Sequence, residues 1–351
     1  MSPAHQLAVV GATGVVGREM LAVLAARKHP LAQVHALASS KSAGTSLAYG
    51  RSEIEVRALD GYDFAQADIA LFAVSAKLAA THVPRAAAAG CVAIDNSSHF
   101  RMKPDVPLVV PEVNAHVLTS SAGGSAPRII ANPNCSTAQL VLALKPLHEA
   151  AGLERVVVAT YQSVSGAGGA AMEELFEQTR RIYGGEGAPK KSALFAKQIA
   201  FNVIPQIQEF MPDGSTREEW KMAAETEKLL GAKIPFCASC VRVPVFIGHG
   251  EAVHVALARP LSVAAARACL RRAPGLELRD ARRAGGYATP VDAAGEDAVF
   301  VSRLRADPSV RHGLAFWLVA DNLRKGAALN AVQIAELVMA RAQRPRAAVA
   351  Q

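Results

Sequence analysis

The 351-residue sequence has no long apolar run, few aromatic residues and little cysteine. Its uninterrupted apolar stretches fall well short of the roughly 18 residues that indicate a membrane-spanning helix, so we expect no membrane association. The first residues contain no charged segment followed by an apolar one, so we expect no signal peptide and a cytoplasmic protein. Aromatic residues make up only 5% of the chain and no basic stripe is interleaved with them, so we expect no nucleic-acid partner.

The five cysteines are an odd number scattered along the chain, which is not typical of a disulfide framework and fits a reducing compartment. Cys237 and Cys240 have the spacing of half a zinc site. No second cysteine pair or histidine pair follows at ligand spacing, so we expect no metal site.

What the sequence does contain is a moderate excess of basic residues, 38 against 30 acidic ones, which gives a net charge of +8. The basic clusters are short and mixed with acidic residues. A small anionic substrate or cofactor accounts for this balance. The length is sufficient for two domains, each with its own core.

The first part of the chain alternates apolar strand patterns with helical ones. Strands are expected at residues 6–10, 33–38, 53–59, 68–74 and 91–95, and helices at 15–27 and 76–89. This alternation is typical of βαβ units, so it predicts an α/β fold with a Rossmann-type, doubly wound parallel sheet.

The pattern changes after residue 135. Strands are expected at 155–162, 239–247 and 251–259, with helices at 170–182 and 216–230. Closely joined strands of this kind indicate an α+β domain with an antiparallel or mixed sheet. A last helix, at about 327–341, is expected to return to the first domain. We therefore expect a nucleotide-binding domain of residues 1–133 and 321–351 and a second domain of residues 134–320.

A glycine-rich segment, GATGVVG, occupies residues 11–17, directly after the first expected strand. Glycines at this spacing permit a tight turn, close approach of backbone N–H groups to a phosphate, and close packing of the helix on the strand. A purely structural turn is the alternative, but the strand–loop–helix context favours a dinucleotide site. The expected cofactor residues are Gly11, Ala12, Thr13, Gly14, Val15 and Val16.

The second expected strand is followed by Ser39, Ser40 and Lys41. A site for NAD usually has an acidic side chain here, which binds the ribose hydroxyls. Hydroxyl groups and a cation are suited instead to the 2′-phosphate of NADP. We therefore expect the cofactor to be NADP.

The segment NPNCST places Cys135 between an apolar run and a helical pattern. A helix N-terminus offers partial positive charge and unpaired N–H donors, which favour a thiolate. The same donors can form an oxyanion hole for a tetrahedral adduct. An inert packing cysteine is the alternative, and local features alone leave both interpretations open.

Six segments in a fixed order carry a resemblance to a known family. They are GATGVVG (11–17), NPNCST (132–137), YQSVSGAG (161–168), EEWKM (218–222), VRVPVFIGH (241–249) and DNLRKGAALNA (321–331). Together they resemble the aspartate-semialdehyde dehydrogenase family over nearly the whole chain. The N-acetyl-glutamyl-phosphate reductases are similar in fold but typically carry a different sequence around the cysteine.

The resemblance implies a reversible reduction of L-aspartyl 4-phosphate by NADPH to L-aspartate 4-semialdehyde and phosphate. This reaction belongs to the biosynthesis of lysine, threonine and methionine. Cys135 is implied as the nucleophile that displaces phosphate and forms a thioester, which splits one difficult step into two easier ones. His249 is implied as the general acid and base, and Gln162 as the residue that orients the substrate or the thioester.

The resemblance also assigns substrate residues. Arg242 is implied to bind the substrate carboxylate, for which a planar guanidinium is suited. Glu218 is implied to bind the amino group, although Glu219 aligns equally well, and Lys221 to bind phosphate. Without the motif, Glu218 and Lys221 read as an ordinary ion pair on one helix face.

Further positions are implied by the same comparison. Arg101 matches a second phosphate-binding position. Ser165 and Gly166 match positions at the nicotinamide end of the cofactor, and Asn322 matches a cofactor contact near the C-terminus. Members of the family are usually homodimers, so a homodimer is expected. The alternatives are a reductase of the same fold that acts on another acyl phosphate or on a coenzyme A thioester, and a non-catalytic NADP-binding protein.

Overall fold

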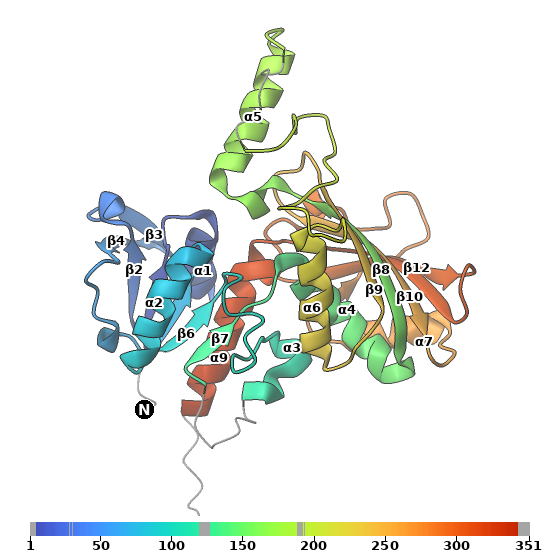
Figure 1. Ribbon diagram of the computed structural model, residues 1–351, viewed down its shortest axis with the longest axis horizontal. Coiled ribbons are helices and arrows are strands. Elements are labelled where there is room, and N and C mark those ends of the chain that lie inside the picture. Colours follow the sequence, from blue (N-terminus) through green and yellow to red (C-terminus); the bar gives the residue numbers. More distant parts are fainter. Residues whose placement is uncertain are drawn as a thin grey trace, which may run out of the picture. The chain divides into compact units, whose positions relative to one another are not determined.

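The computed structural model describes residues 5–27, 29, 31–118, 127–187, 192 and 194–342. Contacts divide the chain into two units, one of residues up to Pro133 and from Ala328 onward, the other of Asn134–Ala327 (Figure 1). The expected first domain also included residues 321–327. In the structure this segment bonds within the second unit, since the Asp321 carboxylate accepts the backbone N–H of Gly295. The last part of the expected first domain, residues 343–351, lies outside the described residues.

The first unit is built on a seven-stranded sheet of order β3-β4-β2-β1-β5-β6-β7. All neighbouring strands are parallel except β3 and β4. The six strands that remain without the edge strand β3 have the order of a dinucleotide-binding fold. The predicted Rossmann-type sheet is confirmed. Its strands are β1 (His5–Val10), β2 (Leu31–Ala38), β3 (Ser46–Tyr49), β4 (Ser52–Ala58), β5 (Ile69–Phe72), β6 (Val92–Asp95) and β7 (Ile129–Ala131).

The core of this unit follows from continuous apolar strands, which are typical of parallel strands covered on both faces. Every residue of β5 and β6 is buried. Helices α1 and α9 pack on each other and place Leu24, Val332 and Ala335 in the same core. The helices of this unit are α1 (Val15–Ala26), α2 (Ala76–Ala88), α3 (Pro111–Asn114) and α9 (Leu329–Ala342).

The second unit contains a six-stranded mixed sheet of order β11-β12-β13-β10-β8-β9, so the predicted mixed sheet is also confirmed. Its strands are β8 (Leu153–Gln162), β9 (Phe236–Arg242), β10 (His249–Leu257), β11 (Leu276–Leu278), β12 (Val299–Asp307) and β13 (Gly313–Ala320). Its helices are α4 (Cys135–Ala151), α5 (Gly169–Tyr183), α6 (Arg217–Leu230), α7 (Val263–Arg272) and α8 (Pro290–Ala293). Helix α4 packs on β8 and β10 and on α6 and α7 (Figure 1).

The expected strand at residues 239–247 is wrong in its bounds. Strand β9 begins earlier and ends at Arg242, because Pro244 has no N–H to continue the ladder. Beyond it, Val243 N–H donates to the Gln162 carbonyl at 3.0 Å, and the Val245 carbonyl accepts from Val164 at 2.9 Å. These two hydrogen bonds hold the segment that follows β9 against the end of β8.

Strands β12 and β13 were not expected, although residues 313–320 form an apolar run that a buried strand would give. The second and third expected strands are joined by a short connection, as expected, but they are not neighbours in the sheet. Strand β9 pairs in parallel with β8, and β10 lies on the other side of β8. In the part of the chain that the structure describes, no helix has the length and apolar character to span a membrane.

Candidate active site

The glycine-rich loop lies at the carboxyl edge of the first sheet. Gly11 has φ +83°, and a Cβ there would lie 2.3 Å from the Ala73 carbonyl oxygen, so only glycine fits. A Cβ on Gly17 would lie 2.1 Å from the Gly11 carbonyl oxygen, which explains the close packing of α1 on the loop. The loop follows β1 and Ala73 follows β5, where the strand order reverses. In open parallel sheets this is the position at which nucleotides bind.

The same edge carries the other expected cofactor residues of this unit. The amides of Gly11 and Ala12 both donate to the carbonyl of Leu37, near the end of β2. Ser39, Ser40 and Lys41 follow β2 directly and are exposed. Helix α1 begins after Gly14, which offers no side chain to cap it. These residues therefore fit a dinucleotide, with helix N–H donors for the pyrophosphate and a cation beyond β2.

Arg101 also belongs to the first unit and is buried. Its Nε donates to the carbonyl of Asn132 at 2.9 Å and its Nη2 to the carbonyl of Asn96 at 2.7 Å. Two backbone acceptors therefore hold the guanidinium in one orientation. The other expected catalytic and substrate residues belong to the second unit.

Cys135 is the first residue of α4, as the sequence predicted. The Asn134 side chain caps this helix, since its Oδ1 accepts the amides of Ser136 at 3.0 Å and Thr137 at 3.3 Å. The prediction that the first amides of the helix form an oxyanion hole is therefore wrong for these two, because Asn134 already occupies them. The Asn134 Nδ2 donates to Glu218 at 2.8 Å, which ties the start of α4 to α6.

Gly326 lies against Cys135 in a π-helical turn, Arg324–Ala328. A Cβ at Gly326 would lie 2.7 Å from the Cβ of Cys135 and 3.1 Å from its Cα. Real Cβ atoms do not approach this closely, so a side chain at this position must displace either the cysteine or the turn itself. The closeness of this backbone to Cys135 was not expected from the sequence.

Gly326→Ala is therefore expected to lower kcat by about 10- to 100-fold, because a small displacement of the reacting atom has an effect of this order. Steady-state kinetics would measure the loss. Thermal unfolding and the rate of Cys135 alkylation would separate a displaced thiol from a destabilised fold. An unchanged kcat would show that the turn yields without moving Cys135.

Glu218 and Glu219 have different surroundings. Glu219 closes a capping box with Thr216 at the start of α6 and accepts the Cys240 amide at 2.9 Å. Glu218 is 3% exposed, and its Oε1 accepts from Asn134 and, at 3.1 Å, from the Gln162 Nε2. The Glu218 carboxylate therefore faces the start of α4, whereas Glu219 serves the helix cap.

Lys221 lies one helical turn after Glu218. Its Nζ is 3.6 Å from the Glu218 Oε2 and donates to the Gln208 Oε1 at 2.6 Å. Gln162 is held in turn by the Thr160 hydroxyl, which donates to its Oε1 at 2.9 Å. Three of the expected residues, Gln162, Glu218 and Lys221, therefore lie in one cluster. Asn134, which precedes Cys135, belongs to the same cluster through its bond to Glu218.

Arg242 and His249 meet around the segment that follows β8. The Arg242 Nη1 donates to the Ser163 carbonyl at 2.6 Å, and the Ser163 amide donates to the His249 Nδ1 at 3.1 Å. A Cβ on Gly166 would lie 3.3 Å from both the Arg242 Nη1 and the His249 Nε2. Burial lowers the pKa of Arg242, and the negative charges of Glu218 and Cys135 raise it in part. The guanidinium is thus within electrostatic reach of the thiolate.

Ser165 and Asn322, which were expected to contact the cofactor, hydrogen-bond with each other. The Asn322 Nδ2 donates to the Ser165 Oγ at 2.9 Å, and its Oδ1 accepts the Gly248 amide at 2.9 Å. The Asn322 Oδ1 also accepts from the Ser163 hydroxyl at 3.0 Å. This network surrounds the loop that precedes His249.

Glu251 is fully buried two residues after His249 on β10. Burial raises the pKa of Glu251 well above its ordinary value, and the Gln139 side chain lowers it in part. Among the described residues neither Glu251 oxygen nor the Gln139 Oε1 has a partner when Glu251 is ionised. A protonated Glu251 can donate to that oxygen, while the Gln139 Nε2 donates to the His249 carbonyl at 3.1 Å. Neutral Glu251 therefore fits this environment.

Glu251→Gln is expected to stabilise the protein increasingly as the pH rises. Below about pH 4.5 the Glu251 carboxyl is protonated in both the folded and the unfolded protein. Above it, unfolding lets the carboxyl ionise, so wild-type stability falls by at most about 1.4 kcal/mol per pH unit until the folded group titrates. Thermal unfolding of the wild type and the variant at about pH 5 and pH 8 would measure how their difference in stability changes with pH. Exposed Glu154→Gln is the control; a pH-independent difference for Glu251→Gln would contradict the expectation.

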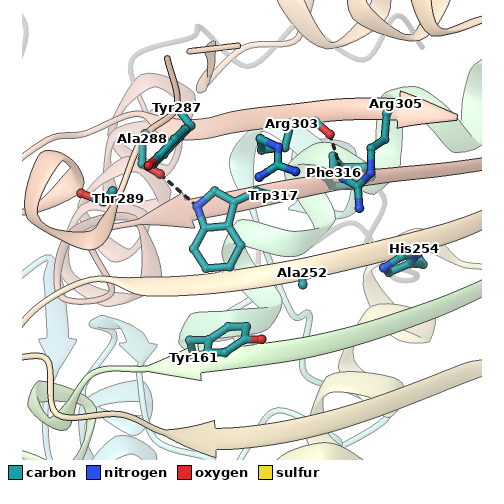
Figure 2. A pocket seen from close by; sticks show the side chains of 10 residues that line it. All are labelled: Tyr161, Ala252, His254, Tyr287, Ala288, Thr289, Arg303, Arg305, Phe316 and Trp317. Carbon is teal, nitrogen blue, oxygen red and sulfur yellow. Dashed lines mark hydrogen bonds between the residues drawn. The ribbon is translucent and has the colours of Figure 1, made fainter. Parts of the chain in front are cut away.

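A cavity of about 440 Å³ lies on the second sheet, on the face that carries Tyr161 and Trp317. None of the expected catalytic or substrate residues lines it, so it is separate from the site described above. The Trp317 Nε1 donates to the Ala288 carbonyl at 3.0 Å, which holds the indole in place (Figure 2). The Tyr161 ring lies beside the indole, with ring centroids 5.6 Å apart and the ring planes tilted by 50°.

Four residues with structural roles at the site were not expected from the sequence. Asn134 had a readable signal, because asparagine directly before a helical pattern is a common N-cap. Ser163, Gln139 and Gly326 had none, since each acts on a residue far away in the chain.

The family models matching this chain describe two semialdehyde dehydrogenase domains. The NAD binding domain matches residues 6–121 and the dimerisation domain residues 144–325. An aspartate-semialdehyde dehydrogenase of Shewanella violacea is 46% identical over 97% of this chain and 99% of its own length. Aspartate-semialdehyde dehydrogenase 2 of Vibrio cholerae is 47% identical over 97% of this chain and 99% of its own.

Solved structures give the same result. Aspartate semialdehyde dehydrogenase II of Vibrio cholerae, complexed with ASA, has a TM-score of 0.92 at 46% identity and covers 97% of this chain and 99% of its own. The enzyme of Candida albicans with NADP has a TM-score of 0.74 at 26% identity, again over 97% and 99%.

Proposed function

The chain belongs to the aspartate-semialdehyde dehydrogenase family, and on this premise we propose the reaction and the residues that carry it. The reaction is the reversible reduction of L-aspartyl 4-phosphate to L-aspartate 4-semialdehyde, a step in lysine, threonine and methionine biosynthesis. The observation that carries the proposal is the position of Cys135 at the start of α4, whose cap is bonded to Glu218.

Cys135 is the proposed nucleophile. Its thiolate attacks the acyl carbon, phosphate leaves, and the resulting thioester is then reduced to the aldehyde. The helix N-terminus and the Arg242 guanidinium both favour the thiolate. Gln162 is proposed to orient the thioester, and His249 to act as the general acid and base.

Arg242 and Glu218 define the proposed substrate. One is a buried cation and the other a buried carboxylate, so together they complement the α-carboxylate and α-ammonium groups of an amino acid. An N-acetylated substrate has no ammonium group to pair with the Glu218 carboxylate. This charge pattern favours aspartyl phosphate over the related acyl phosphates and coenzyme A thioesters.

Lys221 and Arg101 are the proposed phosphate ligands. The Lys221 ammonium carries three N–H donors, and the bond to Gln208 uses one of them. Arg101 is held in one orientation by two backbone carbonyls, which fixes the position of its positive charge. Two cationic side chains are better suited to a dianionic phosphate leaving group than to an uncharged leaving group.

NADP is the proposed cofactor, and when bound it supplies the hydride. The family model supports a nicotinamide dinucleotide, and the Candida albicans relative was solved with NADP. We propose that Gly11, Ala12, Thr13, Gly14, Val15 and Val16 bind the pyrophosphate, and that Ser165, Gly166 and Asn322 lie toward the nicotinamide. Ser39, Ser40 and Lys41 are proposed to bind the 2′-phosphate.

Lys41→Ala is expected to raise KM for NADP by about tenfold or more and to leave KM for NAD nearly unchanged, because a charged hydrogen bond to the 2′-phosphate is lost. Initial rates with each cofactor would measure the two values. Lys233→Ala, at an exposed position of the second unit, is the matched control. Equal effects on NADP and NAD would contradict a role at the 2′-phosphate.

We also propose a cytoplasmic homodimer. The match to a dimerisation domain supports the assembly, and the face of the second sheet that carries Tyr161, 41% exposed, combines aromatic rings with Arg303 and Arg305 (Figure 2). The five free cysteines fit a reducing compartment. Sedimentation velocity would measure the assembly state.

The test of the reaction is to supply the purified protein with NADP, aspartate semialdehyde and phosphate and to measure NADPH formation. Turnover that requires phosphate supports the proposal. No turnover despite NADP binding would identify a non-catalytic homologue. A panel with N-acetylglutamate semialdehyde and with coenzyme A in place of phosphate would reveal a different acyl specificity through its kcat/KM values.

A further inference from the structure

Glu225 is a buried carboxylate that takes no part in the steps proposed above. Its side chain is 1% exposed and lies on the buried face of α6, which also carries Lys221, Met222 and Leu229. Residues at this spacing on a helix normally contribute apolar side chains to a core. Burial of a charge is unfavourable unless the charge is paired or accepts hydrogen bonds, so a carboxylate at this position requires specific partners.

One such partner is the start of α4. The Glu225 Oε2 accepts the backbone N–H of Asn134 at 2.6 Å, and a charged acceptor makes this a strong hydrogen bond. Asn134 is the N-cap of α4 and has an extended backbone, with φ −58° and ψ 146°. Its N–H therefore lies outside the hydrogen-bond series of the helix and depends on an acceptor from elsewhere.

Glu225 supplies from a neighbouring helix the group that many helices supply for themselves. In a capping box, a Glu or Gln three residues after the N-cap accepts the N–H of the N-cap residue. Helix α6 has this arrangement, since Glu219 accepts the Thr216 N–H at 2.6 Å. In α4 the residue at that position is Thr137, whose hydroxyl has no hydrogen-bond partner among the described residues. The carboxylate for the start of α4 comes from α6 instead.

Asn134 is thereby held through both its backbone and its side chain. Its Oδ1 accepts two amides of the first turn of α4, and its Nδ2 donates to the Glu218 Oε1 at 2.8 Å. Glu218 and Glu225 are seven residues apart, so they share one face of α6 and can reach the same neighbour. Two carboxylates of α6 therefore hold the residue directly before Cys135.

The two carboxylates differ in what else they bind. The Glu218 Oε1 also accepts from the Gln162 Nε2, and its Oε2 lies 3.6 Å from the Lys221 Nζ. Each carboxylate oxygen has about two acceptor positions, so a substrate ammonium on Glu218 must share or displace these donors, Asn134 included. The bond from Glu225 goes to a backbone N–H and is outside this competition. Glu225 can keep the cap in place while Glu218 binds the substrate.

We propose that Glu225 is a positioning residue for the nucleophile. Its carboxylate fixes the backbone of Asn134 and thereby the place of Cys135 at the start of α4, whether Glu218 is bonded to Asn134 or to the substrate. The proposal rests on the function proposed above and specifies how the nucleophile keeps its place when the substrate binds. Glu225 itself forms no bond to the substrate and exchanges no proton with it.

A comparison of Glu225→Met with Glu225→Gln tests the hydrogen bond to Asn134. Both variants remove the charge and nearly keep the length of the side chain, but only Gln retains an oxygen that can accept the N–H. We expect Met to lower kcat by about 10- to 100-fold and Gln to recover most of that loss, because misplacement of the reacting atom has an effect of this order. KM for NADP is expected to stay near the wild-type value in both. Equal kcat in the two variants would overturn the proposal.

Two controls accompany the kinetics. Glu227→Met, at an exposed position of α6, is the matched control and is expected to keep the wild-type kcat. Thermal unfolding shows whether each variant is folded. If Glu225→Met does not fold, Glu225→Gln decides alone: a folded Gln variant with less than about a tenth of the wild-type kcat would overturn the proposal, since it retains the acceptor.

Alkylation of Cys135 by iodoacetamide, followed by mass spectrometry of the folded protein, gives a readout that does not depend on the substrate. In a double-mutant cycle, we expect Glu218→Ala to slow alkylation at least about fivefold more in the Glu225→Met protein than in the wild type, because only the wild type still holds Asn134. The same effect of Glu218→Ala in both proteins would overturn the proposal. If the wild type shows no phosphate-dependent turnover but the cycle shows this coupling, the proposed reaction has failed and the positioning role stands.

Discussion

Cys135→Ala is expected to lower phosphate-dependent NADP reduction by at least about 10⁴-fold, because no other group can then accept the acyl chain. In the proposed mechanism the thioester is the species that hydride reduces, so the variant is expected to lose both half-reactions. Initial rates with aspartate semialdehyde, phosphate and NADP would measure the loss. Residual activity within about tenfold of wild type would show that the acyl group is not carried by this cysteine.

Two controls make this result specific. Cys237→Ala removes an exposed thiol on β9 and is expected to leave kcat unchanged. Cys135→Ala is expected to bind NADP as the wild type does, since the proposed site for the cofactor is the glycine-rich loop of the first unit. Loss of NADP binding in Cys135→Ala would indicate damage to the fold, and its activity would then carry no information on the nucleophile.

Arg242→Lys is expected to lower kcat/KM for aspartate semialdehyde by about 10²- to 10³-fold, mainly through KM. The guanidinium is buried and already donates from Nη1 to the Ser163 carbonyl at 2.6 Å. Its planar fork has further donors for a carboxylate, whereas an ammonium on a flexible stem cannot serve both acceptors in fixed geometry.

The measurement is a series of initial rates against aldehyde concentration at saturating NADP and phosphate. Arg155→Lys, at an exposed position of β8, is the control and is expected to behave as the wild type. A kcat/KM for Arg242→Lys within about threefold of wild type would exclude Arg242 as the carboxylate ligand. A loss confined to kcat would place Arg242 at the reacting carbonyl instead.

Local sequence signals predicted much of the fold and the start of the site. The glycine at residue 11 and the continuous apolar β1 and β5 predicted the nucleotide-binding sheet, because such patterns report on backbone geometry and burial within a few residues. The pattern Thr216-x-x-Glu219 is a capping-box signature, so the sequence already contained the reason why Glu219 serves the helix rather than the substrate. Pro244 likewise marked the end of β9.

By itself, the sequence determined the doubly wound sheet, the mixed sheet, and Cys135 at a helix start, since each depends on neighbours in the chain. Only the tertiary structure decided which polar groups around Cys135 and His249 are already hydrogen-bonded within the protein. It showed that Asn134 accepts the first amides of α4, that Gly326 lies against Cys135, and that the Ser163 amide donates to the His249 Nδ1. These are contacts between residues that packing, and not chain order, brings within hydrogen-bond distance.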